Sequence, residues 1–474
     1  MRKLKSILLV SALALGTGMV HAQDSGALLD LLVKKKVLSD QEAEEVRADL
    51  VKEYTSTSAG KINISAPVKE LKIYGDTRVR YEYRQAQSQA NPNDSAGGDR
   101  FRYRLRLGMD VKLTEDWFVG VRLETASGGR STNITMGPTG AGTPWNKTNN
   151  SVYVGQAYVK NTTFPWLTVL AGRMPNPMVC SPMVWDSDIN PEGFAQQLKY
   201  SFGPFEGSEK PSADGKGTVA AAEPNPLTID VFANFGEFVY DSGYKQNSIG
   251  STQSYNDVFL FALQSGAKVN FDKHTFLQVA PTLYLYSSNR NADYISIIYT
   301  GGTAAGNNQT AINNLEIFDI PLEFDWRMYD LPFRAFGEFA YNIQGSERAH
   351  RAQLASATVQ KISGQNIAWQ AGLAVNKIKK KGDWELMAYW QSSGQYALDP
   401  NMVDDDVFDG HLNMQGPVVK AGYALTDAVS LNVAYNYGSI LNKNLGTGGS
   451  GGILSGNPAD KSYNLVQLDV NVKF

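Results

Sequence analysis

Apolar and polar residues alternate without a break through Asp99–Leu113. Every second residue from Phe101 onward is apolar, and arginines occupy the first three positions between them. Because successive side chains of a strand point to opposite faces, this stretch has one hydrocarbon face and one mostly ionic face. Half-buried strands of soluble proteins are usually shorter. The pattern therefore predicts one strand of a wall between lipid and water.

The same alternation recurs along the chain and predicts sixteen strands. They span residues 70–84, 99–113, 116–126, 150–161, 166–174, 192–202, 226–237, 257–271, 274–287, 313–327, 331–343, 365–378, 383–394, 411–424, 428–439 and 461–474. Tight connections such as 114–115 alternate with long ones such as 127–149, as in outer-membrane barrels with short periplasmic turns and long external loops. The connection 203–225 is long where a short turn is expected, so 14 or 18 strands remain alternatives.

The last strand supports a closed barrel. In 463–474, Val466, Leu468, Val470, Val472 and Phe474 share one face, and this ending resembles the signal read by the bacterial outer-membrane assembly machinery. A closed barrel pairs every strand with a neighbour, which membrane-spanning strands require. We therefore expect an all-β transmembrane antiparallel barrel of about sixteen strands over residues 70–474.

The segment before the barrel predicts export and a helical prefix. Residues 1–22 have a basic start, a short apolar core and a small-residue cleavage site, as in a signal peptide. Within residues 23–69, Ser39 and Glu42 form a capping box before a helical pattern. We expect this segment in the periplasm, either as a spacer or cap, or as a coiled-coil or cell-wall contact. The single cysteine, Cys180, excludes an intramolecular disulfide.

Arginines gather on the polar faces of the first three predicted strands. They are Arg78, Arg80, Arg84, Arg102, Arg104, Arg106 and Arg122. A barrel of this size encloses an aqueous lumen, so neighbouring strands would join these side chains into one patch on the inner wall. Two interpretations remain open. The patch is a lattice of ion pairs with Asp76, Glu82 and Glu124 that stiffens the wall, or it is the basic side of a pore constriction.

The predicted external loop 175–191 supplies a candidate acidic side. It holds four prolines and several large apolar residues, which favours folding into the lumen rather than into solvent. Asp186, Asp188 and Glu192 would then face the arginines, and a field between the two sides would favour polar solutes. The alternative is a loop packed on the barrel rim or on a neighbouring subunit.

The remaining polar motifs give weaker predictions. Asp404, Asp405, Asp406 and Asp409 predict a solvated external loop, with a divalent-cation site as an alternative that matches no EF-hand spacing. The chain has four histidines and no GxSxG, Walker, CxxC or HExxH motif, so we expect no enzyme, cofactor or metal. A net charge of −3 argues against a nucleic-acid partner.

Several segments resemble the putative porin family of Gram-negative outer membranes. They are ALLDLLVKKKVLSDQEAEE before the barrel, Ala171-Gly172-Arg173, WDSDINPEGF and DDDVFDGHLNMQGPVVKAGYAL. The helical prefix is also similar to that of phosphate-selective porins, although the basic wall here is arginine rather than lysine. The resemblance implies a homo-trimeric channel.

Together these patterns predict a porin, a passive channel for small polar or charged solutes. Its expected surroundings are outer-membrane lipid and lipopolysaccharide. The alternative is a structural or adhesive barrel that contacts the cell wall through its helical prefix.

Overall fold

The computed structural model describes residues 33–35, 39, 41–46, 65–89, 93, 95–114, 116–126, 131–137, 151–205, 227–241, 257–287, 315–355, 362–447 and 460–474. The chain forms two compact units, Met1–Ala66 and Pro67–Phe474. In the first unit residues 41–46 are helical. The predicted capping box is confirmed there, because the Ser39 N–H donates to Glu42 Oε2 at 2.8 Å and the Glu42 N–H donates to Ser39 Oγ at 3.2 Å. The predicted signal peptide lies outside the described residues.

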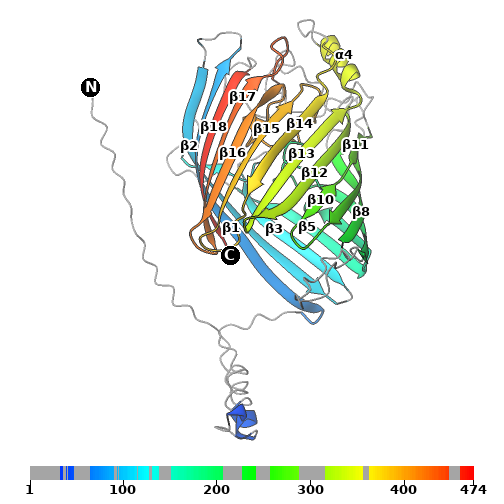
Figure 1. The fold of residues 1–474 in the computed structure, drawn as a ribbon, viewed down its shortest axis with the longest axis vertical. Helices are drawn as coiled ribbons and strands as arrows, with labels where there is room; N and C mark the ends of the chain where they lie inside the picture. The colour runs from blue at the N-terminus through cyan, green and yellow to red at the C-terminus, as the bar shows by residue number, and fades with distance from the viewer. Residues whose placement is uncertain are drawn as a thin grey trace, which may run out of the picture. The chain divides into compact units, whose positions relative to one another are not determined.

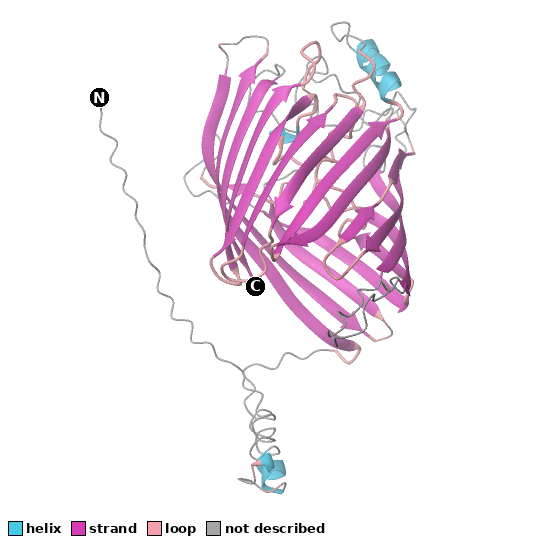
Figure 2. Cartoon of the chain, viewed as in Figure 1, coloured by secondary structure: helices cyan, strands magenta, loops and turns pink. Residues whose placement is uncertain are grey.

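The second unit is an antiparallel barrel (Figures 1 and 2). Its strands are β1 (Val68–Ser88), β2 (Ser95–Leu113), β3 (Trp117–Ala126), β4 (Ile134–Thr135), β5 (Ser151–Phe164), β6 (Leu167–Arg173), β7 (Glu192–Phe205), β8 (Leu227–Asp241), β9 (Val258–Asn270), β10 (Phe276–Val279), β11 (Thr282–Tyr286), β12 (Glu316–Met328), β13 (Leu331–Asn342), β14 (Ile367–Val375), β15 (Trp384–Ser393), β16 (Met414–Ala424), β17 (Val429–Ile440) and β18 (Asp460–Lys473). Since β10 and β11 are two halves of one strand and β4 has only two residues, the wall has sixteen full strands, as predicted.

The barrel closes where the first strand meets the last. β1 pairs with β2 on one edge and with β18 on the other, so no edge is left at this seam. The terminal Phe474 completes the seam, because its backbone exchanges hydrogen bonds of 2.9 and 3.1 Å with Gly75. β7 also pairs directly with β8, so no further strand pair lies between them in the barrel wall, and the alternatives of 14 and 18 strands are wrong.

Three details differ from the sequence prediction. The expected strand 274–287 is interrupted at Pro281, because proline has no N–H to donate to a neighbouring strand. The expected loop 344–364 contains helix α4 (Gly345–Ala355), whose Ala349 and Ala352 pack against Tyr396. The expected loop 127–149 contains β4, which pairs with β2. A short alanine-faced helix and a two-residue strand both lack the two-residue alternation that marks the long strands.

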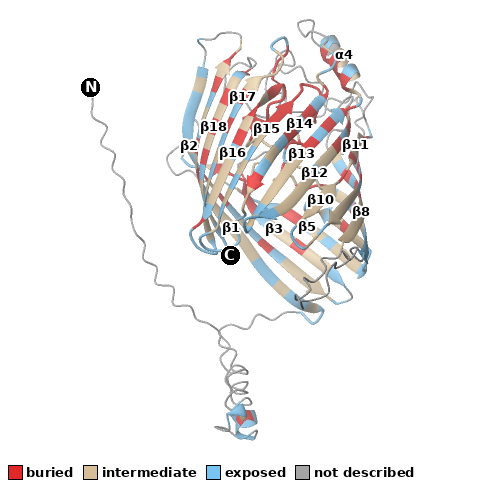
Figure 3. Ribbon diagram, in the orientation of Figure 1, coloured by how far each residue is buried: buried red, intermediate tan, exposed pale blue. Residues whose placement is uncertain are grey.

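The strands present apolar side chains outward and mixed side chains inward. In β9, Phe259, Phe261 and Leu263 are exposed on the outer face, whereas Leu260 and Gln264 alternate with them and are buried. Figure 3 shows the same alternation of buried and exposed positions on neighbouring strands. No helix in the described part of the chain is long and apolar enough to span a membrane.

Candidate functional site

The arginine patch lies on the inner face of β1, β2 and β3. In the pairing of β1 with β2, Arg78 lies opposite Arg104 and Arg80 lies opposite Arg102. Cation therefore faces cation across the strands, and the wall needs carboxylates close by. The register supplies one directly, because Asp76 lies opposite Arg106.

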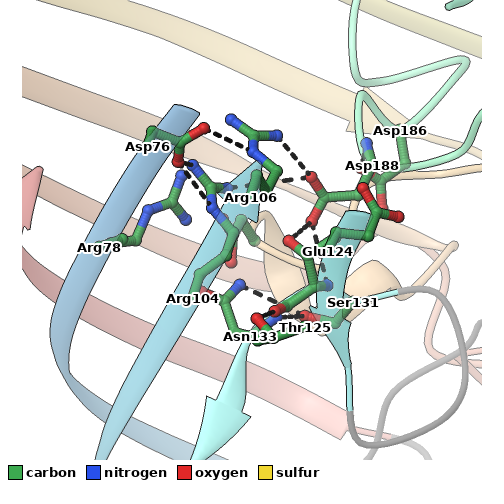
Figure 4. A network of polar contacts seen from close by, with 12 residues as sticks. Asp76, Arg78, Arg104, Arg106, Glu124, Thr125, Ser131, Asn133, Asp186 and Asp188 are labelled. Atoms are coloured by element: carbon green, nitrogen blue, oxygen red, sulfur yellow. Dashed lines mark hydrogen bonds and ion pairs between the residues drawn. The ribbon is translucent and has the colours of Figure 1, made fainter. Parts of the chain in front are cut away.

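Ion pairs within the wall neutralise part of the patch. Asp76 accepts a hydrogen bond from Arg104 Nη2 and one from Arg106 Nε, both at 2.7 Å, and lies between the two guanidinium groups (Figure 4). Glu82 accepts one from Arg100 Nε at 2.6 Å and lies 3.4 Å from Arg102 Nη1. These contacts are ion pairs with Asp76 and Glu82, as expected for a lattice of ion pairs within the wall.

The seven arginines differ in how much of each remains accessible. Arg80, Arg102 and Arg104 are buried. Arg78, Arg84, Arg106 and Arg122 are only partly covered, with 23% of the Arg106 side chain exposed against 4% for Arg80. The three buried arginines are thus enclosed with their ion-pair partners, whereas the other four keep part of the side chain exposed.

Loop 175–191 folds into the barrel and crosses to the opposite wall. Gln264 on β9 holds the backbone of Val179 by two hydrogen bonds. The Val179 N–H donates to Gln264 Oε1 at 3.0 Å, and Gln264 Nε2 donates to the Val179 carbonyl at 2.8 Å. The Ser181 N–H donates to Glu338 Oε1 on β13 at 2.8 Å. Trp185 is buried against Phe238, with ring centroids 5.8 Å apart. The apolar residues that favoured an inward loop are the ones that anchor it.

This loop brings one carboxylate to the arginine wall. Asp188 Oδ1 lies 3.8 Å from Arg106 Nη1 and 4.0 Å from Arg104 Nη1, and the other oxygen of Asp188 accepts a hydrogen bond from Thr132 Oγ1 at 2.9 Å. In Figure 4, Asp188 faces Arg106 across the gap between loop and wall. The distance to Arg106 is longer than in the wall's own ion pairs, so this contact is the looser one.

Glu192 lies away from the arginine wall. It begins β7 and lies opposite Arg173 of β6 in the strand pairing, where the two side chains form an exposed ion pair at 2.9 Å. Strand register directs Glu192 to this neighbour, so it does not join the acidic side with Asp188.

A second loop, 394–413, also folds inward and supplies carboxylates that the sequence prediction placed elsewhere. Asp406 accepts hydrogen bonds from Arg80 Nη1 and Gln467 Nε2, both at 2.7 Å, and Asp409 lies 3.3 Å from Arg84. The prediction of a solvated acidic loop is therefore wrong. Its buried apolar residues hold the loop in place: Leu398, Met402, Val403, Val407, Phe408 and Leu412.

The two inward loops meet at a cluster of three carboxylates. The Asp186 N–H donates to the Met402 carbonyl at 2.6 Å, and the Asp404 N–H donates to the Pro182 carbonyl at 3.1 Å. Asp186, Asp404 and Asp405 bring oxygen atoms within 4.8 Å of one another. In the described part of the chain, this is the one group of acidic, histidine or cysteine side chains close enough together to hold a metal ion.

The crowding changes the proton affinity of the cluster. Burial, followed by the charges of Asp404 and Asp188, raises the pKa of Asp186 to about 9. Burial and the charge of Asp406 raise the pKa of Asp405 to about 7 and that of Asp404 to about 6. All three groups thus keep protons at a pH where an ordinary aspartate is ionised.

We expect cation preference to increase between pH 5 and pH 9. A raised carboxyl pKa means that the neutral form persists to higher pH, so the cluster gains negative charge as pH rises through this range. Reversal potentials in a KCl gradient at the two pH values measure the change. The double variant Asp404→Asn/Asp405→Asn should lose most of it. A full pH response in that variant would show that other groups titrate.

One comparison with known proteins gives a family match. The profile of a family described as putative porin matches residues 84–312. None of the curated proteins matches the chain in sequence.

Three solved structures are among those similar to the chain. Pseudomonas putida OprB, solved at high pH, has 10% identity and a TM-score of 0.46, over 85% of this chain and 94% of OprB. Salmonella typhi OmpF in complex with daunomycin has 11% identity and a TM-score of 0.44, over 87% and 99%. The outer-membrane channel DcaP of Acinetobacter baumannii has 13% identity and a TM-score of 0.40, over 88% and 100%. The family match confirms the resemblance noted in the sequence, and it extends over residues 84–312.

Proposed function

We propose that the chain forms a water-filled channel in the outer membrane, through which small polar and charged solutes diffuse passively. One observation carries the proposal. Inside a closed sixteen-strand barrel, partly exposed arginines face the carboxylates of two inward loops: Arg106 lies 3.8 Å from Asp188, and Arg84 lies 3.3 Å from Asp409. Charged groups on both sides of a gap favour solutes that carry charge or strong dipoles over apolar ones.

The family match and the barrel fold indicate an outer-membrane channel rather than an enzyme. We further propose that residues 1–22 are removed on export, that residues 23–69 lie in the periplasm, and that the channel is a homo-trimer surrounded by lipid and lipopolysaccharide. The proposal of a homo-trimer rests on the family resemblance alone.

Incorporation into planar lipid bilayers tests the proposed function. We expect discrete current steps whose size grows linearly with voltage and rises with KCl concentration. Heat-denatured protein from the same preparation is the control. A folded barrel that gives no current above that control would contradict the channel and would favour a structural or adhesive barrel.

A further inference from the structure

A cavity of about 300 Å³ lies beside loop 175–191 and is separate from the gap between Arg106 and Asp188. Val179–Pro182 form one side of it, and β10 with β12–β16 form the other. Cavities of this size suit a small organic molecule. Its lining combines cations, aromatic rings and amide groups, so its chemistry differs from that of the arginine wall.

Lys420 provides the principal charge of the cavity. Among the described residues, no carboxylate lies within 4.0 Å of its ammonium group; Asp404 and Asp406 act on it only from a greater distance. Its Nζ lies 5.9 Å from the centre of the Tyr389 ring. Arg334 adds a second cation, partly neutralised by Glu323 at 3.9 Å. Lys420 is thus the cation able to bind an anion here.

Two carboxylates line the cavity, Glu323 beside Arg334 and Glu338 beside loop 175–191, and both already have partners. Glu338 accepts hydrogen bonds from the N–H and the hydroxyl of Ser181 and from Gln370 Nε2, the last at 3.2 Å. A carboxylate with three donors on it has little capacity left for a cationic ligand. Because Glu323 offsets Arg334 and Glu338 is held by three donors, Lys420 is the charge that the cavity offers to a ligand.

Two aromatic rings form the apolar part of the lining. Phe336 and Tyr389 meet edge to face, with centroids 5.8 Å apart and planes at 66°. Arg334 lies over the face of Phe336 at 5.2 Å, as Lys420 lies over that of Tyr389. A sugar would need a free ring face to stack on, and the cations leave less room there. A ligand with an aromatic ring and an anionic group can contact both the cations and the ring edges.

We propose that this cavity is a binding site for small aromatic monocarboxylates. The carboxylate binds Lys420, with Arg334 close by, and the ring packs against Phe336, Tyr389 and Met387. The proposal deepens the proposed function, because it names a solute class that would pause in the lumen. Binding itself does not depend on conduction, so the two proposals fail separately.

Titration calorimetry with benzoate on the folded protein in detergent tests the site. We expect saturable binding of benzoate, and much weaker binding of acetate and benzyl alcohol, which each lack one half of the ligand. Loss of one charge-assisted contact in Lys420→Gln should weaken benzoate binding about tenfold or more. Lys268→Gln is the matched control. Lys268 also lies over an aromatic ring, with its Nζ 3.6 Å from the centre of Phe276, but it does not line this cavity.

Three results would overturn the site. They are benzoate binding no tighter than acetate, equal binding by wild type and Lys420→Gln, and tighter binding of glucose than of benzoate. Single-channel recording separates the two proposals. Benzoate should reduce the current of a conducting wild-type channel and spare that of Lys420→Gln. A protein that binds benzoate without conducting would keep the site and contradict the channel.

Discussion

Trp185→Ala is expected to raise the single-channel conductance and to lower the stability of the docked loop. Trp185 is buried inside the barrel, where its ring lies 5.8 Å from that of Phe238 and 6.1 Å from that of Tyr284. Its indole Nε1–H also donates to the Ile189 carbonyl at 3.1 Å. Truncation of a buried tryptophan costs about 3–5 kcal/mol, which changes the ratio of docked to undocked loop by a factor of about 100 or more.

The barrel itself should survive this change, because its strands are held by backbone pairing rather than by the loop. Single-channel recording measures conductance, and limited proteolysis within 175–191 reports whether the loop is released. Trp369→Ala is the matched control, since Trp369 is 40% exposed on the outer face of β14. Equal conductance in wild type and Trp185→Ala would mean that this loop does not narrow the permeation path.

Neutralising three of the four partly exposed arginines is expected to shift the channel towards cations. Arg78, Arg106 and Arg122 keep 14–23% of their side chains exposed. Clusters of like charge in a narrow passage change local ion concentrations by about tenfold or more. The triple glutamine variant should therefore reduce the chloride-to-potassium permeability ratio on the order of tenfold. The reversal potential in a KCl gradient measures that ratio.

Two further variants control this experiment. Arg173→Gln removes an arginine from the exposed pair with Glu192 and should leave the reversal potential unchanged. Asp188→Asn should shift it in the opposite direction from the triple variant. If the triple variant and Arg173→Gln gave the same reversal potential, the arginines would act only as structural groups. Arg102 and Arg104 are unsuitable for this test, because their buried ion pairs make loss of folding the first consequence.

The strands were predictable because one physical rule governs all of them. A side chain that faces lipid must be apolar, so a two-residue period marks every strand and even the terminal Phe474. The interruption at Pro281 was equally open to prediction, since a proline inside a predicted strand cannot donate a ladder hydrogen bond. Helix α4 was not predicted, because its small buried residues, Ala349 and Ala352, give a weak helical pattern.

The acidic side of the site was harder to predict. The prolines and large apolar residues of 175–191 correctly predict a loop that folds into the lumen, and Asp188 of this loop lies near Arg106. Strand register decides that Glu192 pairs with Arg173, and one sequence does not reveal register. The acidic neighbours of Asp406 favour a solvated loop when the sequence is read alone. The apolar residues on either side, Met402 and Phe408 among them, were the signal for a second inward loop.

Chemical modification of a cysteine at position 106 tests most directly that the gap between wall and loop is the permeation path. In a Cys180→Ser background, Arg106→Cys channels should show an abrupt fall in current when a bulky anionic thiol reagent reacts. Leu107→Cys, on the outer face, should show none. Unchanged current in fully modified Arg106→Cys channels would show that solutes do not pass through this gap.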